Sequence, residues 1–181
     1  MASLVRCLLL SNGRRCQNGG MELRTAAPED WQASREIRIR ALSQDPDAFC
    51  SSLQREIGMA DQEWRDRLER GTTVLAWDGE SAVGTVTGKA DPHEAGGREI
   101  VAMWVDPACR GTGLADALIS RVVEWAGEDG AHEVALWVAE DNAHARSLYE
   151  RTGFALTGER EPMRPGVDQV RMRRELRGAS D

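Results

Sequence analysis

Apolar residues recur along the chain at two spacings, and the spacing changes from one segment to the next. Residues Ile100 to Val105 form an unbroken, largely β-branched apolar run, which predicts a buried strand. Pro107 ends this run. A helix is predicted next, because apolar residues recur at steps of four, four and three: Leu114, Leu118, Val122 and Trp125. Gly127 is the predicted end of that helix.

The rest of the chain alternates between the same two patterns. Other strands are predicted at Glu22–Ala26, Thr72–Trp77, Ala82–Lys89, Glu133–Val138, Phe154–Glu159 and Gln169–Leu176. Other helices are predicted after Pro28, over Gln54–Arg70, and from Asp141 or Asn142 to Thr152, where Gly153 supplies a left-handed cap. A tight turn containing Asp78-Gly79 is predicted to join two strands as a hairpin. Residues 160–167 are predicted to form a long loop. This order predicts one mixed α/β domain with helices on both faces of its sheet.

A short glycine-rich loop lies between the central strand and its helix. It reads Arg110-Gly111-Thr112-Gly113. The first amides of a helix have no internal partner and carry partial positive charge, so they can hold an anion. Glycine lets the backbone approach a phosphate, and Arg110 adds a full charge. The loop has neither Walker nor Rossmann spacing, and a purely structural turn is the alternative.

Composition narrows the class of protein. The chain has 181 residues, with 41% hydrophobic and 29% charged residues, which is typical of a globular domain. A net charge of −7 argues against nucleic-acid binding and mildly favours cationic substrates. The four cysteines and three histidines form no metal-binding pattern, so we expect reduced thiols and no metal. No segment is long and apolar enough to span a membrane, and we expect a cytoplasmic protein.

A second motif, taken together with the anion loop, resembles a known family. Residues 137–154 read W-V-A-E-D-N-A-H-A-R-S-L-Y-E-R-T-G-F, and they follow the loop at a fixed distance. Together the two motifs resemble the GCN5-related N-acetyltransferases (GNAT superfamily). The resemblance implies a GNAT-like fold, with a central, mostly antiparallel sheet of about seven strands flanked by about four helices. The acetyltransferase domain is expected over residues 21–177, with residues 178–181 as a frayed tail. Residues 1–20 match no periodic pattern, so we expect a disordered leader or a remnant of an upstream start, and a short helix used in dimer contacts is the alternative.

The resemblance also implies a coenzyme site. Acetyl-CoA would be the co-substrate, with its pyrophosphate on Arg110 and on the backbone of the loop and first helical turn: Gly111, Thr112, Gly113, Leu114 and Ala115. Its pantetheine arm would pair with the strand edge at Met103, Trp104 and Val105. An amide at Trp104 or Val105 would polarise the thioester carbonyl. Asn142 would either bind the pantetheine or hold the loop before its helix.

Two residues are candidates for proton transfer. Tyr149 is the sole tyrosine, and by its place in the motif it would protonate the departing thiolate. Glu99 is the best candidate for the general base, acting directly or through water, although a dedicated base is not required. Strand alternation predicts that Glu99 shares one face with Val101, Met103 and Val105.

The acceptor is not identified by any motif. The resemblance places Trp31, Phe49 and Trp64 beside an acceptor pocket, and ordinary core packing is the alternative for each. The function predicted is therefore acetyl transfer to a primary amine of a small molecule or of a peptide or protein, by direct attack in a ternary complex. A non-catalytic, acetyl-CoA-binding regulatory module is the second hypothesis, and a homodimer is allowed by the resemblance.

Overall fold

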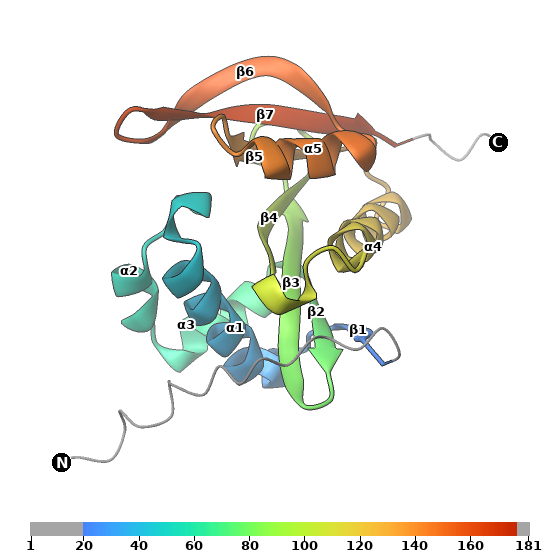
Figure 1. The fold of residues 1–181 in the computed structure, drawn as a ribbon. Coiled ribbons are helices and arrows are strands. Elements are labelled where there is room, and N and C mark those ends of the chain that lie inside the picture. The colour runs from blue at the N-terminus through green and yellow to red at the C-terminus, as the bar shows by residue number, and fades with distance from the viewer. Residues whose placement is uncertain (1–19, 177–181) are drawn as a thin grey trace.

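The computed structural model describes residues 20–176, which form a seven-stranded sheet with helices on both faces (Figure 1). The strands lie in the order β1-β2-β3-β4-β5-β7-β6, and β4–β5 is the parallel pair in an otherwise antiparallel sheet. Their bounds are β1 (Glu22–Thr25), β2 (Gly71–Asp78), β3 (Ser81–Ala90), β4 (Arg98–Val105), β5 (Glu133–Ala139), β6 (Ala155–Arg164) and β7 (Val167–Glu175). The predicted mixed, mostly antiparallel architecture is confirmed.

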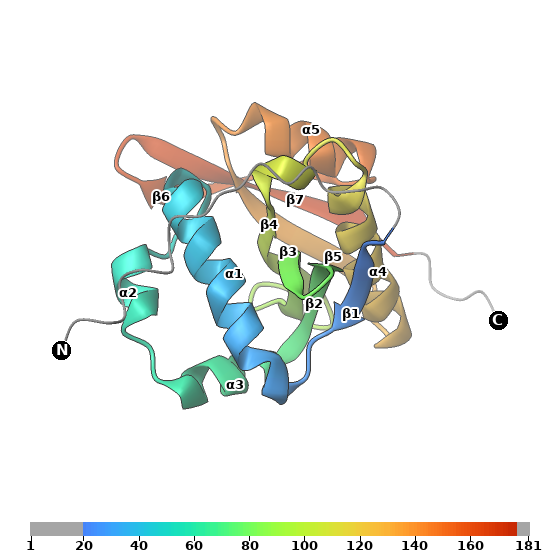
Figure 2. The same ribbon diagram turned by 60° about the horizontal axis from the view of Figure 1, so that its bottom comes forward.

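The described chain contains five α-helices. They are α1 (Trp31–Gln44), α2 (Leu53–Ile57), α3 (Asp61–Glu69), α4 (Leu114–Glu128) and α5 (Ala143–Arg151). Figure 2 shows α1 and α4 on opposite sides of strands β2–β4. α4 and α5 share one apolar cluster with residues of the sheet, including Leu118 and Tyr149, whereas α1 and α3 pack on a smaller cluster around Leu75 and Trp104. The two faces of the sheet therefore pack against two different apolar clusters.

A bulge in β4 changes which side chains share a face. Thr87 pairs with Val101 and Thr85 pairs with Trp104, so two residues of β4 oppose one of β3. Ala102, inside the bulge, has a positive φ of 54°, which is unfavourable for a residue with a Cβ. One prediction is therefore wrong: that a single face carries Glu99, Val101, Met103 and Val105. Met103 and Val105 pack with the α4 cluster, while Glu99 lies across from Lys89.

The parallel pairing of β4 with β5 is short. Its register covers three pairs, from Arg98–Val134 to Ile100–Leu136, although both strands continue further. On its other side, β4 stays paired with β3 up to Val105. One backbone edge of β4 is therefore not paired with β5 beyond Ile100.

Several predicted boundaries are corrected by the structure. The single helix predicted over Gln54–Arg70 is two helices, because the chain breaks at residues 58–60. α4 continues through Gly127, and the left-handed residue after it is Gly130, with φ of 74°. The long loop predicted at 160–167 is a tight hairpin between β6 and β7 with Gly166 at φ of 76°. Proline is tolerated there because β6 is an edge strand.

The remaining expectations concern membranes, metals and thiols. None of the helices within residues 20–176 is long and apolar enough to cross a membrane. In the same range no cluster of His, Cys, Asp and Glu side chains is arranged to hold a metal ion. Cys50 is a free, exposed thiol. The predicted leader and tail lie outside the described residues, save Gly20.

Candidate active site

The glycine loop adopts a backbone that side chains disfavour. Gly111 and Gly113 have φ of 78° and 83°, and a Cβ at either position would meet no atom within 4 Å. The glycines are therefore required by their dihedral angles rather than by crowding. The Thr112 hydroxyl donates to the Cys109 carbonyl at 2.7 Å and fixes the loop between them. Gly113 is the N-cap residue of α4, so the unpaired amides of its first turn open on this loop.

An acidic residue lies in the first turn of α4 but is neutralised. Asp116 accepts two hydrogen bonds from Arg151 of α5, at 2.9 and 3.0 Å. These hydrogen bonds lower the pKa of Asp116. The pair joins α4 to α5, and it offsets a negative charge that would otherwise oppose an anion at the helix N-terminus.

Arg110 is tied to two other elements. Its Nε donates to the Val105 carbonyl at 3.1 Å, and its Nη2 donates to Oδ2 of Asp45 at 2.6 Å. The same Asp45 oxygen accepts from the Trp104 indole at 2.7 Å. Asp45, the C-cap of α1, therefore fixes both the loop and the end of β4. No sequence pattern indicates this role of Asp45.

The open edge of β4 presents the backbone of Val105. The next residue, Asp106, donates its N–H to the Val83 carbonyl of β3 at 2.9 Å. Successive backbone groups of a strand point alternately to its two sides, so the Val105 N–H points away from β3 and the Trp104 N–H points toward it. Of the two amides predicted to polarise a carbonyl, Val105 is the one on the open edge.

Asn142 and Tyr149 lie on α5, beyond that edge. The Asn142 side chain accepts from the Ala145 amide at 3.0 Å and caps the helix, which is the second of its two predicted roles. Gly153 follows the helix with φ of 91°, as predicted, and the Phe154 amide donates to the Tyr149 carbonyl at 3.0 Å. This cap turns Phe154 back onto the tyrosine ring, with ring centroids 5.9 Å apart.

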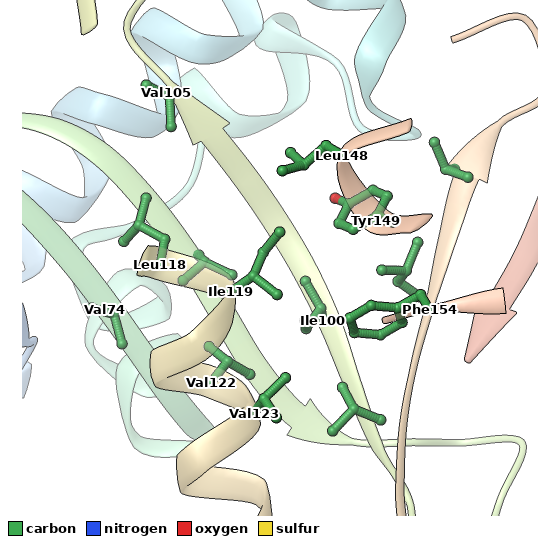
Figure 3. Packing of buried hydrophobic residues seen from close by; sticks show 14 of the residues in the cluster. Val74, Ile100, Val105, Leu118, Ile119, Val122, Val123, Leu148, Tyr149 and Phe154 are labelled. Carbon is green, nitrogen blue, oxygen red and sulfur yellow. The ribbon is translucent and has the colours of Figure 1, made fainter. Parts of the chain in front are cut away.

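Tyr149 is almost fully enclosed. It is 7% exposed and packs within the α4–α5 cluster (Figure 3). Figure 3 shows its hydroxyl oxygen on the side of the ring that faces β4. That hydroxyl makes no hydrogen bond to any residue between 20 and 176. Burial raises the pKa of Tyr149 above its ordinary value, so the phenol stays protonated.

Glu99 lies on the other face of β4. Its carboxylate is 10% exposed and forms an ion pair with Lys89 of β3 at 2.7 Å. The bulge separates Glu99 from the face of Met103 and Val105, so the structure does not bring it to the side where Tyr149 packs. Glu99 would therefore approach a reacting group from the face covered by α1 and α3.

A pocket of about 410 Å³ lies on that face. Its floor includes Val101 and Ala102 of the β4 bulge, and its walls come from α1, α2 and α3. Trp64, one of the three candidate acceptor-site residues, lines this pocket and is 2% exposed. Phe49 and Trp31 do not line it; both are packed against the smaller cluster, and Phe49 stacks under Arg38, which does line the pocket. A second hollow over β6–β7 shares no residue with the predicted site.

The pocket contains charged residues that sequence analysis did not select. Glu56 is 1% exposed and is held by Arg38 and Arg67, each at 2.9 Å. Burial opposes its ionisation, but hydrogen bonds from the two arginines lower the pKa of Glu56 to about 2. The pattern of an acid inside an otherwise polar helix carries no signal of burial, so only the fold reveals this cluster.

Comparison with known proteins identifies the family. The sequence model of the acetyltransferase (GNAT) family matches residues 31–154, which include the loop, both motifs and most of the sheet. The chain therefore belongs to the GNAT family of acetyltransferases. No curated protein sequence matches the chain.

Solved structures of low sequence identity share the fold. A GNAT-family acetyltransferase from Streptococcus pneumoniae matches with a TM-score of 0.75 and 20% identity, over 87% of this chain and 99% of its own. The yncA protein from Salmonella typhimurium, solved with its cofactor acetyl-CoA, matches with a TM-score of 0.72 and 20% identity, over 90% and 97%. The PaiA N-acetyltransferase from Thermoplasma acidophilum, in complex with coenzyme A, matches with a TM-score of 0.68 and 14% identity, over 87% and 99%.

Proposed function

We propose that this protein transfers acetyl from acetyl-CoA to a primary amine of a small molecule or of a peptide or protein, by direct attack in a ternary complex. One observation carries the proposal: β4 leaves β5 after Ile100, its C-terminal end leads into the Gly111–Gly113 loop, and Tyr149 packs in the same apolar cluster as Ile100 and Val105 of that strand. Membership of the GNAT family supports it, as do the coenzymes present in the yncA and PaiA structures.

The coenzyme is held by backbone more than by side chains. The amides of the loop and of the first turn of α4, including those of Leu114 and Ala115, bind the pyrophosphate. The pantetheine arm lies along the free edge of β4 from Met103 to Val105 as an added strand. Arg110 contributes charge at the loop, although its guanidinium shares that charge with Asp45. Asn142 keeps the start of α5 in place beside the arm.

The chemistry needs no covalent enzyme intermediate. The neutral amine nitrogen attacks the thioester carbon, and the negative charge that develops on the carbonyl oxygen is stabilised by the Val105 N–H. Collapse breaks the carbon–sulfur bond, and Tyr149 gives its proton to the leaving thiolate. The amine proton passes to Glu99, directly or through water, and solvent returns a proton to Tyr149. Because Glu99 is ion-paired with Lys89, that pair must loosen when the carboxylate accepts the proton.

A non-catalytic coenzyme-binding module is the second candidate. It would keep the loop and the open strand edge but would have no need of a protonated, enclosed phenol facing β4. Tyr149 is buried as a side chain, its hydroxyl makes no hydrogen bond to residues 20–176, and burial keeps the phenol protonated, which favours the enzyme. A cytoplasmic location, where acetyl-CoA is available, a domain spanning residues 21–177, and a homodimer are further parts of the proposal.

The experiment is a panel of amines and peptides, with coenzyme A release followed by chromatography. The wild type releases coenzyme A with at least one acceptor, and Tyr149→Phe retains coenzyme A binding while losing turnover. Arg110→Ala combined with Gly113→Glu abolishes coenzyme binding. Unchanged turnover in Tyr149→Phe would remove the acid role, and coenzyme binding by an enzyme inert toward the entire panel would favour the regulatory module.

A further inference from the structure

The pocket on the α1–α3 face is strongly cationic, although the chain as a whole is acidic with a net charge of −7. Five cationic side chains line it against one carboxylate, that of Glu56: Arg38, Arg55, Arg67, Arg70 and Lys89. A concave site lined by one sign of charge concentrates the opposite charge. The local charge therefore opposes the mild preference for cationic substrates that the composition predicted.

The acids nearby do not consume all of this charge. Glu56 accepts from Arg38 and Arg67, Glu99 pairs with Lys89, and Asp66 lies 3.8 Å from Arg70. Arg55, on α2, has no ion pair and no side-chain hydrogen bond within residues 20–176. Counting these three acids against the five cations leaves the pocket with an excess of positive charge.

Two buried donors in the pocket wall also lack an acceptor. Nη1 of Arg38 and Nε1 of Trp64 are shielded from solvent and have no hydrogen-bond partner among the described residues. Both residues line the pocket. Buried donors are rarely left unpaired, because an unpaired donor has lost its hydrogen bonds to water without replacing them. An oxyanion bound in the pocket would supply acceptors to its arginines, whose planar guanidinium groups suit carboxylate and phosphate oxygens.

The pocket is placed to hold an acceptor during transfer. Val101 and Ala102 in its floor belong to the segment of β4 that has already separated from β5. Lys89, which lines the pocket, forms an ion pair with Glu99, the candidate base, with 2.7 Å between Nζ and Oε2. Its volume of about 410 Å³ lies within the range of small-molecule sites and is too small for a folded partner.

We propose that the acceptor is a small amine that also carries an oxyanion, a carboxylate or a phosphate, and that the arginine-lined pocket binds this anionic group. This inference rests on the proposed acetyl transfer and specifies its substrate class. The anion lies among Arg38, Arg55 and Arg67, which leaves the amino group free to point to the bulge of β4 and the thioester.

Matched pairs of acceptors test the proposal. L-phenylalanine is compared with 2-phenylethylamine and L-methionine with 3-(methylthio)propylamine, so that each pair differs by a carboxylate. 2-Aminoethyl phosphate is compared with ethanolamine to test phosphate as the source of the anion. We expect kcat/KM to be at least tenfold higher for the anionic member of a pair, which corresponds to one charge-assisted hydrogen bond. The pair with the larger ratio identifies the anion.

Variants of the pocket connect the preference to its arginines. Arg55→Glu and Arg55→Gln change an exposed side chain without ion-pair partners in the described structure, so both are expected to fold. Each lowers kcat/KM for the anionic acceptor, by about tenfold for glutamine and more for glutamate, and leaves KM for acetyl-CoA unchanged. Arg121→Gln, on the exposed face of α4, is the matched control and changes neither value.

Three outcomes would overturn the inference. They are equal kcat/KM within every pair, a preference for the uncharged or cationic member, and loss of acetyl-CoA affinity in the Arg55 variants, which would assign the pocket to the coenzyme. Calorimetric titration of the amino acids and of 2-aminoethyl phosphate gives a second readout. These anions could bind the wild type but not Arg55→Glu while no acceptor is acetylated. In that case the pocket does bind anions, and the proposed acetyl transfer is wrong.

Discussion

The Arg110 guanidinium and the Asp45 carboxylate lie 2.6 Å apart, joining the loop before α4 to the C-cap of α1. Under the proposed function, an anion at this loop competes with Asp45 for the same charge. Both side chains are partly exposed, so the competition is worth about 1 kcal/mol at most.

Asp45→Asn is therefore expected to raise the affinity for coenzyme A up to about fivefold, because it frees Arg110 while leaving an oxygen for the Trp104 indole. Titration calorimetry at low and physiological salt measures the change. The double variant Asp45→Asn/Arg110→Ala shows no gain over Arg110→Ala. A gain that persists in the double variant would mean that Asp45 does not act through Arg110.

Tyr149 is expected to act as an acid over the entire working range of pH. Burial raises the pKa of its hydroxyl, so it remains protonated through pH 10 and contributes no falling limb to the profile of kcat below that value. Tyr149→Phe is expected to lower kcat about 100-fold, with coenzyme A affinity within about twofold of wild type. Stopped-flow and steady-state rates from pH 6 to 10 measure this, and a profile that falls through pH 8 in the wild type but not in the variant would contradict it.

Alanine substitutions at two glycines distinguish the effect of loop conformation on coenzyme binding from the effect of core packing on stability. Gly113→Ala meets no neighbouring atom, so it costs only the left-handed backbone, about 1–2 kcal/mol, and weakens coenzyme binding by distorting the loop. Gly88→Ala places a Cβ 2.7 Å from both Trp125 and Val122, so it destabilises by about 1–3 kcal/mol through overpacking. Denaturant unfolding and calorimetry measure both. Gly88→Ala serves as the stability-matched control, with coenzyme affinity unchanged.

Glu56 makes stability depend on acid pH. Its folded pKa of about 2 lies below the ordinary value of 4.5, so the stabilisation is complete above about pH 4.5 and is lost as pH falls toward 2. The difference corresponds to about 3 kcal/mol. Glu56→Gln is expected to lose about that much at pH 7, with the deficit shrinking below pH 4.5. Urea unfolding across this range measures it, and Glu80→Gln, in an exposed turn, is the control without such a change.

The parts of the site that sequence predicts are those set by local backbone chemistry. Gly153 is predicted as a left-handed cap and has a φ of 91°. Gly111 and Gly113, predicted only as positions where the backbone can approach a phosphate, also have positive φ. The bulge at Ala102 has no such signal, since register between β3 and β4 is a property of both strands together. It moved Glu99 to the opposite face from Val105. The cluster of Glu56, Arg38 and Arg67 likewise joins residues 11 and 18 positions apart, a proximity that only the packing of α1, α2 and α3 creates.

The short β4–β5 junction has a mechanical consequence. Within the sheet, β1–β4 and β5–β7–β6 are joined by three register pairs, and the two groups of strands part where the coenzyme is proposed to lie. A pantetheine arm that pairs with β4 would occupy the place where β4 and β5 part. A ligand that binds the folded state alone stabilises that state by mass action, so the stability of this fold would rise with the concentration of coenzyme.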